Sequence, residues 1–127
     1  MPIPKNVLFI DDEKPVLNSI RRFFRNESFK CYFAENYEEM LQFLEEEITF
    51  HVVVSDMRMP GPGGIEILKY FYENSPQTYR VALTAYSQPA QILAAINHGH
   101  VNKYFLKPLK FDTELKKVIN NHLDSLP

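Results

Sequence analysis

The 127-residue sequence contains one cysteine, Cys31, so the chain cannot form an internal disulfide. It also lacks an apolar run long enough for the core of a signal peptide or for a membrane-spanning helix. Both absences are typical of a protein of the reducing cytoplasm, and we expect no membrane partner. Cys31 is most simply a small core residue, because no evident histidine or metal partner accompanies it in the sequence.

The sequence has no strong excess of charge of either sign. The 14 Lys and Arg residues nearly balance the 16 Asp and Glu residues, which leaves a formal net charge of -2. Such a chain has no field that would gather duplex nucleic acid, so we expect no direct nucleic-acid contact. With 45% apolar residues the length suffices for one hydrophobic core, and we expect residues 1–127 to form one domain, whether alone or within a longer chain.

Five short apolar or aromatic runs alternate with five segments of helical periodicity. The run at 52–54 is β-branched and is closed by Ser55 and Asp56, then by Pro60 and Gly61, which is typical of a buried central strand. The expected strands are 7–10, 31–34, 52–54, 80–83 and 103–106, and the expected helices are about 15–26, 37–48, 64–74, 89–99 and 111–126.

Short connections between alternating strands and helices predict an α/β protein, with a doubly wound five-stranded parallel sheet and five helices on its two faces. The strand order 2-1-3-4-5 is favoured, because the first, third and fourth runs are the most continuously apolar. Asp12 and Glu13 are placed to cap the first helix, and Asn36 the second. The glycines and proline of 61–64 delay the third helix until Gly64.

Polar residues follow four of the five expected strands directly. Asp11 and Asp12 follow the first strand, Asp56 the third, Thr84 the fourth and Lys107 the fifth. Because the carboxyl ends of parallel strands meet at one edge of a sheet, these side chains should converge there. Crowded carboxylates repel one another, and Mg²⁺, which prefers oxygen ligands, would relieve that repulsion. The sequence therefore predicts a magnesium site at this edge.

A carboxylate surrounded by a metal, a hydroxyl and an ammonium group is suited to attack phosphorus and to carry a phosphoryl group. Asp56 would be the acceptor, with Thr84 and Lys107 in contact with phosphoryl oxygens and the backbone carbonyl of Arg58 as a further metal ligand. Each residue alone has an ordinary alternative, such as a helix cap for Asp11 or a surface ion pair for Lys107. Their joint placement at strand ends favours a single site.

Four motifs, in order and at suitable spacing, resemble the motif set of response-regulator receiver domains of two-component signalling, and the resemblance covers essentially the whole chain. They are Asp11-Asp12, Asp56-Met57-Arg58-Met59-Pro60-Gly61, Leu83-Thr84-Ala85 and Tyr104-Phe105-Leu106-Lys107-Pro108. The resemblance implies a flavodoxin-like fold. It also implies that Asp56 accepts a phosphoryl group from a phosphohistidine, in a sensor histidine kinase or a histidine phosphotransfer protein. Asp11, Asp12, Asp56 and the Arg58 carbonyl would bind Mg²⁺.

In that family a Thr or Ser moves toward the phosphoryl group while an aromatic residue on the fifth strand turns inward. Thr84 and Tyr104 stand at the matching places, although Tyr104 is equally compatible with a plain half-buried strand aromatic. The resemblance implies that the face around the fourth helix, fifth strand and fifth helix is the readout. A following output domain, a separate effector protein and a homodimer all remain open as partners.

Two other readings of the same residues remain. A haloacid-dehalogenase-like phosphatase also uses a nucleophilic Asp, Mg²⁺, Thr and Lys, but it carries a second Asp two positions after the nucleophile, where this sequence has Arg58. A receiver-like interaction module that no longer takes phosphate is the other. We expect a phosphoacceptor that assists its own phosphorylation and dephosphorylation, not an enzyme that turns over a separate substrate.

Overall fold

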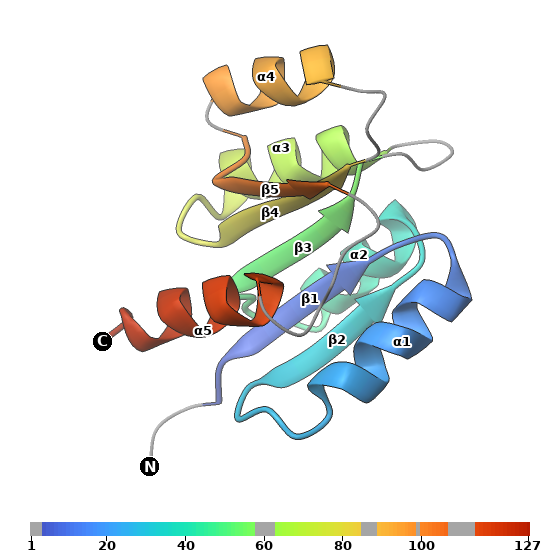
Figure 1. Cartoon of the computed structure of the whole chain (residues 1–127), viewed down its shortest axis with the longest axis vertical. Coiled ribbons are helices and arrows are strands. Elements are labelled where there is room, and N and C mark those ends of the chain that lie inside the picture. Colours follow the sequence, from blue (N-terminus) through green and yellow to red (C-terminus); the bar gives the residue numbers. More distant parts are fainter. Residues whose placement is uncertain (1–3, 58–62, 85–88, 99, 107–113) are drawn as a thin grey trace.

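The computed structural model describes residues 4–57, 63–84, 89–98, 100–106 and 114–127. Five parallel strands form one sheet in the order β2-β1-β3-β4-β5, which confirms the predicted order (Figure 1). The three inner strands are almost fully buried, whereas β2 and β5 leave most of their residues open to solvent. The strands are β1 (Asn6–Ile10), β2 (Lys30–Ala34), β3 (Val52–Asp56), β4 (Tyr79–Thr84) and β5 (Lys103–Leu106).

The helices cover both faces of the sheet (Figure 1). One face carries α1 (Lys14–Phe24) and α5 (Lys116–Asp124), and the other carries α2 (Tyr37–Glu45), α3 (Gly64–Asn74) and α4 (Pro89–Asn97). This is the doubly wound α/β architecture that the alternation of strands and helices predicts. None of the helices in the described ranges has the length and apolar content needed to cross a membrane.

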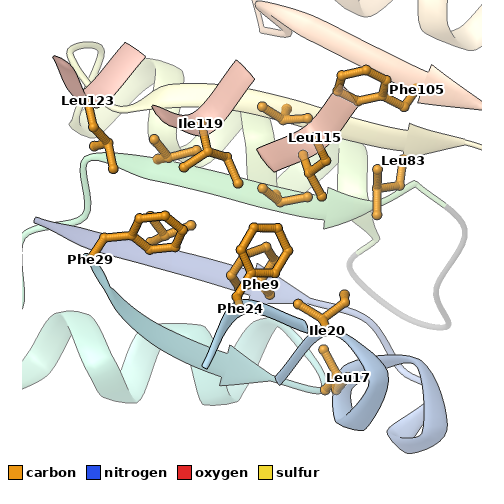
Figure 2. Close-up of a cluster of buried hydrophobic side chains, with 14 residues drawn as sticks. Phe9, Leu17, Ile20, Phe24, Phe29, Leu83, Phe105, Leu115, Ile119 and Leu123 are labelled. Atoms are coloured by element: carbon orange, nitrogen blue, oxygen red, sulfur yellow. The ribbon is translucent and has the colours of Figure 1, made fainter. Parts of the chain in front are cut away.

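The core layer under α1 and α5 combines aromatic and aliphatic side chains. Figure 2 shows Phe9, Phe24 and Phe29 beside one another, with Leu115 and Ile119 of the α5 segment reaching toward the same layer. The rings of Phe9 and Phe24 are 5.2 Å apart between centroids. Because burying each such side chain contributes about 1.5–3 kcal/mol, this layer anchors both helices to the central strands.

The helix ends differ from the predicted ones in detail. The second helix ends at Glu45 instead of about 48, and Glu47 has a φ of 62°, which takes the chain out of the helical path. Asn36 caps that helix as predicted, since its Oδ1 accepts a hydrogen bond from the Glu39 amide at 2.8 Å. The first residues of the predicted last helix, including Phe111, lie outside the described residues.

The predicted capping of the first helix by Asp12 and Glu13 is wrong. Glu13 is the N-cap residue, but its side chain makes no capping hydrogen bond. Instead, the Oδ1 atom of Asp11 accepts a hydrogen bond from the Glu13 amide at 2.9 Å. Pro15 in the first turn has no N–H to satisfy, so this helix start needs one capping acceptor fewer.

Candidate functional site

Two acidic residues come together at the carboxyl edge of the sheet because their strands are neighbours. Asp56 is the last residue of β3, and Asp11 directly follows β1. Strands β1 and β3 are paired in register up to Ile10 and Ser55, so the next residue on each strand lies at the same edge. The carboxylate oxygens of Asp11, Asp12 and Asp56, one from each residue, all lie within 4.8 Å of one another.

The three carboxylates differ in their exposure to solvent. The side chains of Asp11 and Asp56 are buried, with 1% and 5% of their surface exposed, whereas Asp12 is exposed. Three negative charges at this separation, two of them shielded from water, repel one another strongly. A hard divalent cation would offset that repulsion, and an all-oxygen donor set of this size fits Mg²⁺. The acidic cluster is therefore a candidate metal centre open to solvent on the Asp12 side.

Thr84 lies at the same edge, one strand further along. It is the last residue of β4 and is buried, with 2% of its surface exposed. Asp56 is paired with Leu83, and the Met57 amide donates a hydrogen bond to the Leu83 carbonyl at 2.8 Å. These pairings hold the end of β4 beside the acidic cluster. The other two predicted members of the site, Arg58 and Lys107, lie outside the described residues, and their roles stay predictions.

Tyr104 is at a different place in the molecule. It is the second residue of β5, the edge strand, and 44% of its surface is exposed. Leu106, two residues on, is 47% exposed, so this side of β5 presents apolar surface to solvent. A groove of about 790 Å³ runs between β5 and α5 and is lined in part by Tyr104, Lys117 and Asn121. Tyr104 thus belongs to an open face beside α5.

Sequence analysis missed two residues that support the site and one that holds the opposite end of β4. Ser55, fully buried at the end of the central strand, and Gly64, at the start of α3, both contact the backbone of Asp56. Arg80 is buried in β4, where its guanidinium donates hydrogen bonds to the carbonyls of Pro76, Thr78 and His100. In the sequence, only its position as a charged residue inside an apolar run indicated that Arg80 is buried. Nothing in the local sequence pattern indicated the contact between Gly64 and Asp56.

Comparison with known proteins identifies the family. The family model described as "Response regulator receiver domain" matches residues 7–120. The chain therefore belongs to the response-regulator receiver domains of two-component systems. In fold it is similar to a response regulator receiver domain protein from Clostridium thermocellum, with a TM-score of 0.84 and 27% sequence identity over 94% of each chain.

Two curated relatives are regulatory proteins. The chain is 31% identical over 118 residues to the hydrogenase transcriptional regulatory protein HoxA of Bradyrhizobium diazoefficiens, covering 93% of this chain and 24% of that protein. It is 30% identical over 117 residues to the regulatory protein AtoC of Escherichia coli, covering 92% and 25% respectively. The chain thus spans about a quarter of the length of these relatives. The family match favours a regulatory domain over the phosphatase reading.

Proposed function

We propose that Asp56 accepts a phosphoryl group from a phosphohistidine, carried by a sensor histidine kinase or by a histidine phosphotransfer protein. The observation that supports this proposal most directly is the gathering of three carboxylates within 4.8 Å, with the buried Asp56 at the end of the central strand. Carboxylates gathered at one edge of a sheet repel one another, and a bound divalent cation would offset that repulsion.

In the proposed reaction a carboxylate oxygen of Asp56 forms a bond to phosphorus. The phosphorus–nitrogen bond of the donor breaks, and the imidazole nitrogen keeps its electron pair. The carboxylate needs no base, because it carries no proton that must be removed. Bound Mg²⁺ would supply positive charge against the phosphoryl oxygens, held by Asp11, Asp12, Asp56 and the Arg58 carbonyl. The Thr84 hydroxyl donates a hydrogen bond to one of those oxygens.

Lys107 completes the proposed site as a positive charge at another phosphoryl oxygen, after β5. A phosphoryl group there biases a two-state equilibrium, because it adds a dianion beside Thr84. Strand pairing supports the route by which the change would spread: Thr84 is paired with Leu106, and Ala82 with Tyr104. We propose the face of α4, β5 and α5, including Tyr104, as the surface whose conformation then changes.

We propose that residues 1–127 act in the cytoplasm as one receiver unit without direct contact to nucleic acid. Its output passes to a following domain, to a separate effector protein or to a second copy through the α4–β5–α5 face. Two relatives are named as a transcriptional regulatory protein and a regulatory protein, and each is about four times as long as this chain. Their names and lengths support an output domain in the native protein. To test this proposal, the longer native gene product is expressed and the activity of the part outside residues 1–127 is measured. That activity should depend on phosphorylation.

Incubation with a small-molecule phosphodonor such as acetyl phosphate tests the acceptor. The native protein should gain one phosphoryl group per chain in the presence of Mg²⁺ and none in EDTA, as measured by intact-protein mass spectrometry. Asp56→Asn should gain none, whereas the control Asp124→Asn, which removes an exposed carboxylate on α5, should be labelled like the native protein. Undiminished labelling of the Asp56→Asn protein would refute the assignment.

Two further measurements separate the competing functions. Mg²⁺-dependent binding of beryllofluoride, followed by NMR of backbone amides, should occur with the native protein; its absence would indicate an interaction module that no longer takes phosphate. Many turnovers of a small phosphoester, with release of inorganic phosphate, would instead indicate a phosphatase. Stoichiometric labelling without turnover is the result that we expect.

A further inference from the structure

The peptide that follows Asp56 is held from more than one side. Its carbonyl oxygen accepts a hydrogen bond from the Ser55 hydroxyl at 3.1 Å, and its N–H, which belongs to Met57, donates to the Leu83 carbonyl at 2.8 Å. Both Ser55 and Asp56 are buried, so water cannot replace these partners freely. The direction in which the Asp56 side chain leaves the backbone depends on this peptide.

The third contact is made by Gly64, the first residue of α3. A Cβ atom placed on Gly64 would lie 2.1 Å from the Asp56 carbonyl oxygen, 2.8 Å from its carbonyl carbon and 2.7 Å from the Met57 Cα. Each of these atoms belongs to backbone, so no side chain can rotate aside to make room. The start of α3 therefore rests directly on the peptide after the phosphoacceptor, at a distance that only glycine permits.

We propose that Gly64 is a positioning residue for the phosphoacceptor. Because Gly64 has no side chain, α3 can pack directly on the Asp56–Met57 peptide and hold it in the orientation that places the Asp56 carboxylate beside Asp11 and Asp12. This inference rests on the proposed function of Asp56 as acceptor. It assigns Gly64 a role beyond allowing a helix to begin, because the contact is with the backbone of another element.

Neither Asp56 nor α3 can move away from this contact without disrupting buried packing. Asp56 ends a strand that is buried at all five positions and paired on both sides, with β1 and β4. On the other side, α3 is fastened to the core by Ile67, Leu68 and Phe71, which are buried. An added Cβ must open the contact by about 1 Å to reach 3.0 Å, the shortest separation that real Cβ atoms show.

A displacement of that size matters for a phosphoryl acceptor. Misplacing a reacting group by about 1 Å costs on the order of 10²-fold in rate, because the attacking oxygen must meet phosphorus in line. The same peptide leads directly to Arg58, whose carbonyl is a proposed metal ligand, so its rotation would disturb the metal site as well. We therefore expect Gly64→Ala to slow labelling about 100-fold at saturating Mg²⁺ and acetyl phosphate.

The control must distinguish displacement of the Asp56 carboxylate from a general loss of folding stability. Met40→Ala removes a fully buried side chain from α2, a helix that does not carry Gly64, and core truncations of this kind are strongly destabilising. Labelling rates are measured at saturation and divided by the folded fraction from urea titrations. On that scale Met40→Ala should be labelled at the native rate, whereas Gly64→Ala should not. If Gly64→Ala is largely unfolded, trimethylamine N-oxide is added to all samples to refold it.

Ser55→Ala supplies a second, sterically mild test. It removes the hydroxyl that holds the same carbonyl, so the peptide loses one restraint, and labelling per folded molecule should be slower than in the native protein but faster than in Gly64→Ala. Native labelling rates in both Gly64→Ala and Ser55→Ala, per folded molecule, would overturn the inference while leaving Asp56 as acceptor. Absence of labelling in the native protein would instead overturn the proposed function itself.

Discussion

The acidic cluster should lower the stability of the metal-free protein, and removal of one charge should restore it. Asp56→Asn is the sharpest perturbation, because Asp56 is the buried member that folding brings to Asp11 and Asp12. In the unfolded chain the two neighbouring aspartates still repel each other, but Asp56 is far from both along the sequence. The substitution keeps the size of the side chain, removes its charge and replaces one acceptor oxygen by an NH2 donor.

The size of the effect follows from the separation of the oxygens. Two unit charges 4.8 Å apart repel with about 0.9 kcal/mol in bulk water and about 3.5 kcal/mol at an effective dielectric constant of 20. Asp56 has two such partners, of which Asp12 is exposed and therefore well screened. This repulsion by itself would make Asp56→Asn more stable to unfolding than the native protein by about 2 kcal/mol at low ionic strength.

Urea unfolding followed by circular dichroism, at neutral pH and with EDTA, measures this difference. Added KCl should shrink it, since salt screens the exposed part of the repulsion. Mg²⁺ should stabilise the native protein as its concentration rises above the dissociation constant, and it should stabilise Asp56→Asn much less. Asp124→Asn, the exposed control, should change neither the stability nor its Mg²⁺ dependence.

Two results would refute this reasoning. If Asp56→Asn is no more stable than the native protein in EDTA, repulsion among the three carboxylates does not destabilise the metal-free protein. If Mg²⁺ stabilises both proteins equally, the metal does not bind at the acidic cluster, and Asp56 loses its proposed role as a ligand.

Three further predictions concern other parts of the molecule. Lys107→Ala should fold and still bind beryllofluoride, but amide NMR shifts at the α4–β5–α5 face should no longer change; an unaltered switch would remove Lys107 from the mechanism. Arg80→Met should lower the free energy of unfolding by about 3 kcal/mol in urea titrations, because three carbonyls lose a charged donor. Burial lowers the pKa of His51, His100 and His122, so the unfolded chain binds more protons than the folded protein below about pH 6.5. The free energy of unfolding should therefore fall on acidification from that pH and level off below the folded-state pKa values. A free energy of unfolding that does not change between pH 7 and 5 would contradict this.

His122 carries part of that pH dependence for a visible reason. Its ring stacks on Tyr79 with centroids 4.4 Å apart, and Nε2 is buried without a hydrogen-bond partner among the described residues. An added proton would therefore be held in an apolar contact beside His51, whose own charge lowers the pKa of His122 further. The structure thus accounts for His122 as a packed histidine.

The sequence by itself determined the order of the elements and the residues at the ends of the strands. Continuous apolar runs such as 52–54 can only be satisfied in the middle of a sheet, and a polar residue that ends such a run must emerge at its carboxyl edge. Asp11, Asp56 and Thr84 are therefore brought to one place by local pattern and topology alone. Helix ends were less accurate, because small differences in capping shift them by a few residues.

The contacts that hold the two ends of the sheet in place are seen only in the folded protein. The approach of Gly64 to the Asp56 carbonyl and the three carbonyls bound by Arg80 join segments whose separation depends on how helices pack on the sheet. Periodicity records which face of an element is apolar, but it carries no measure of the distance between two backbones. Contacts fixed to a fraction of an ångström by close packing are therefore visible only once the chain is folded.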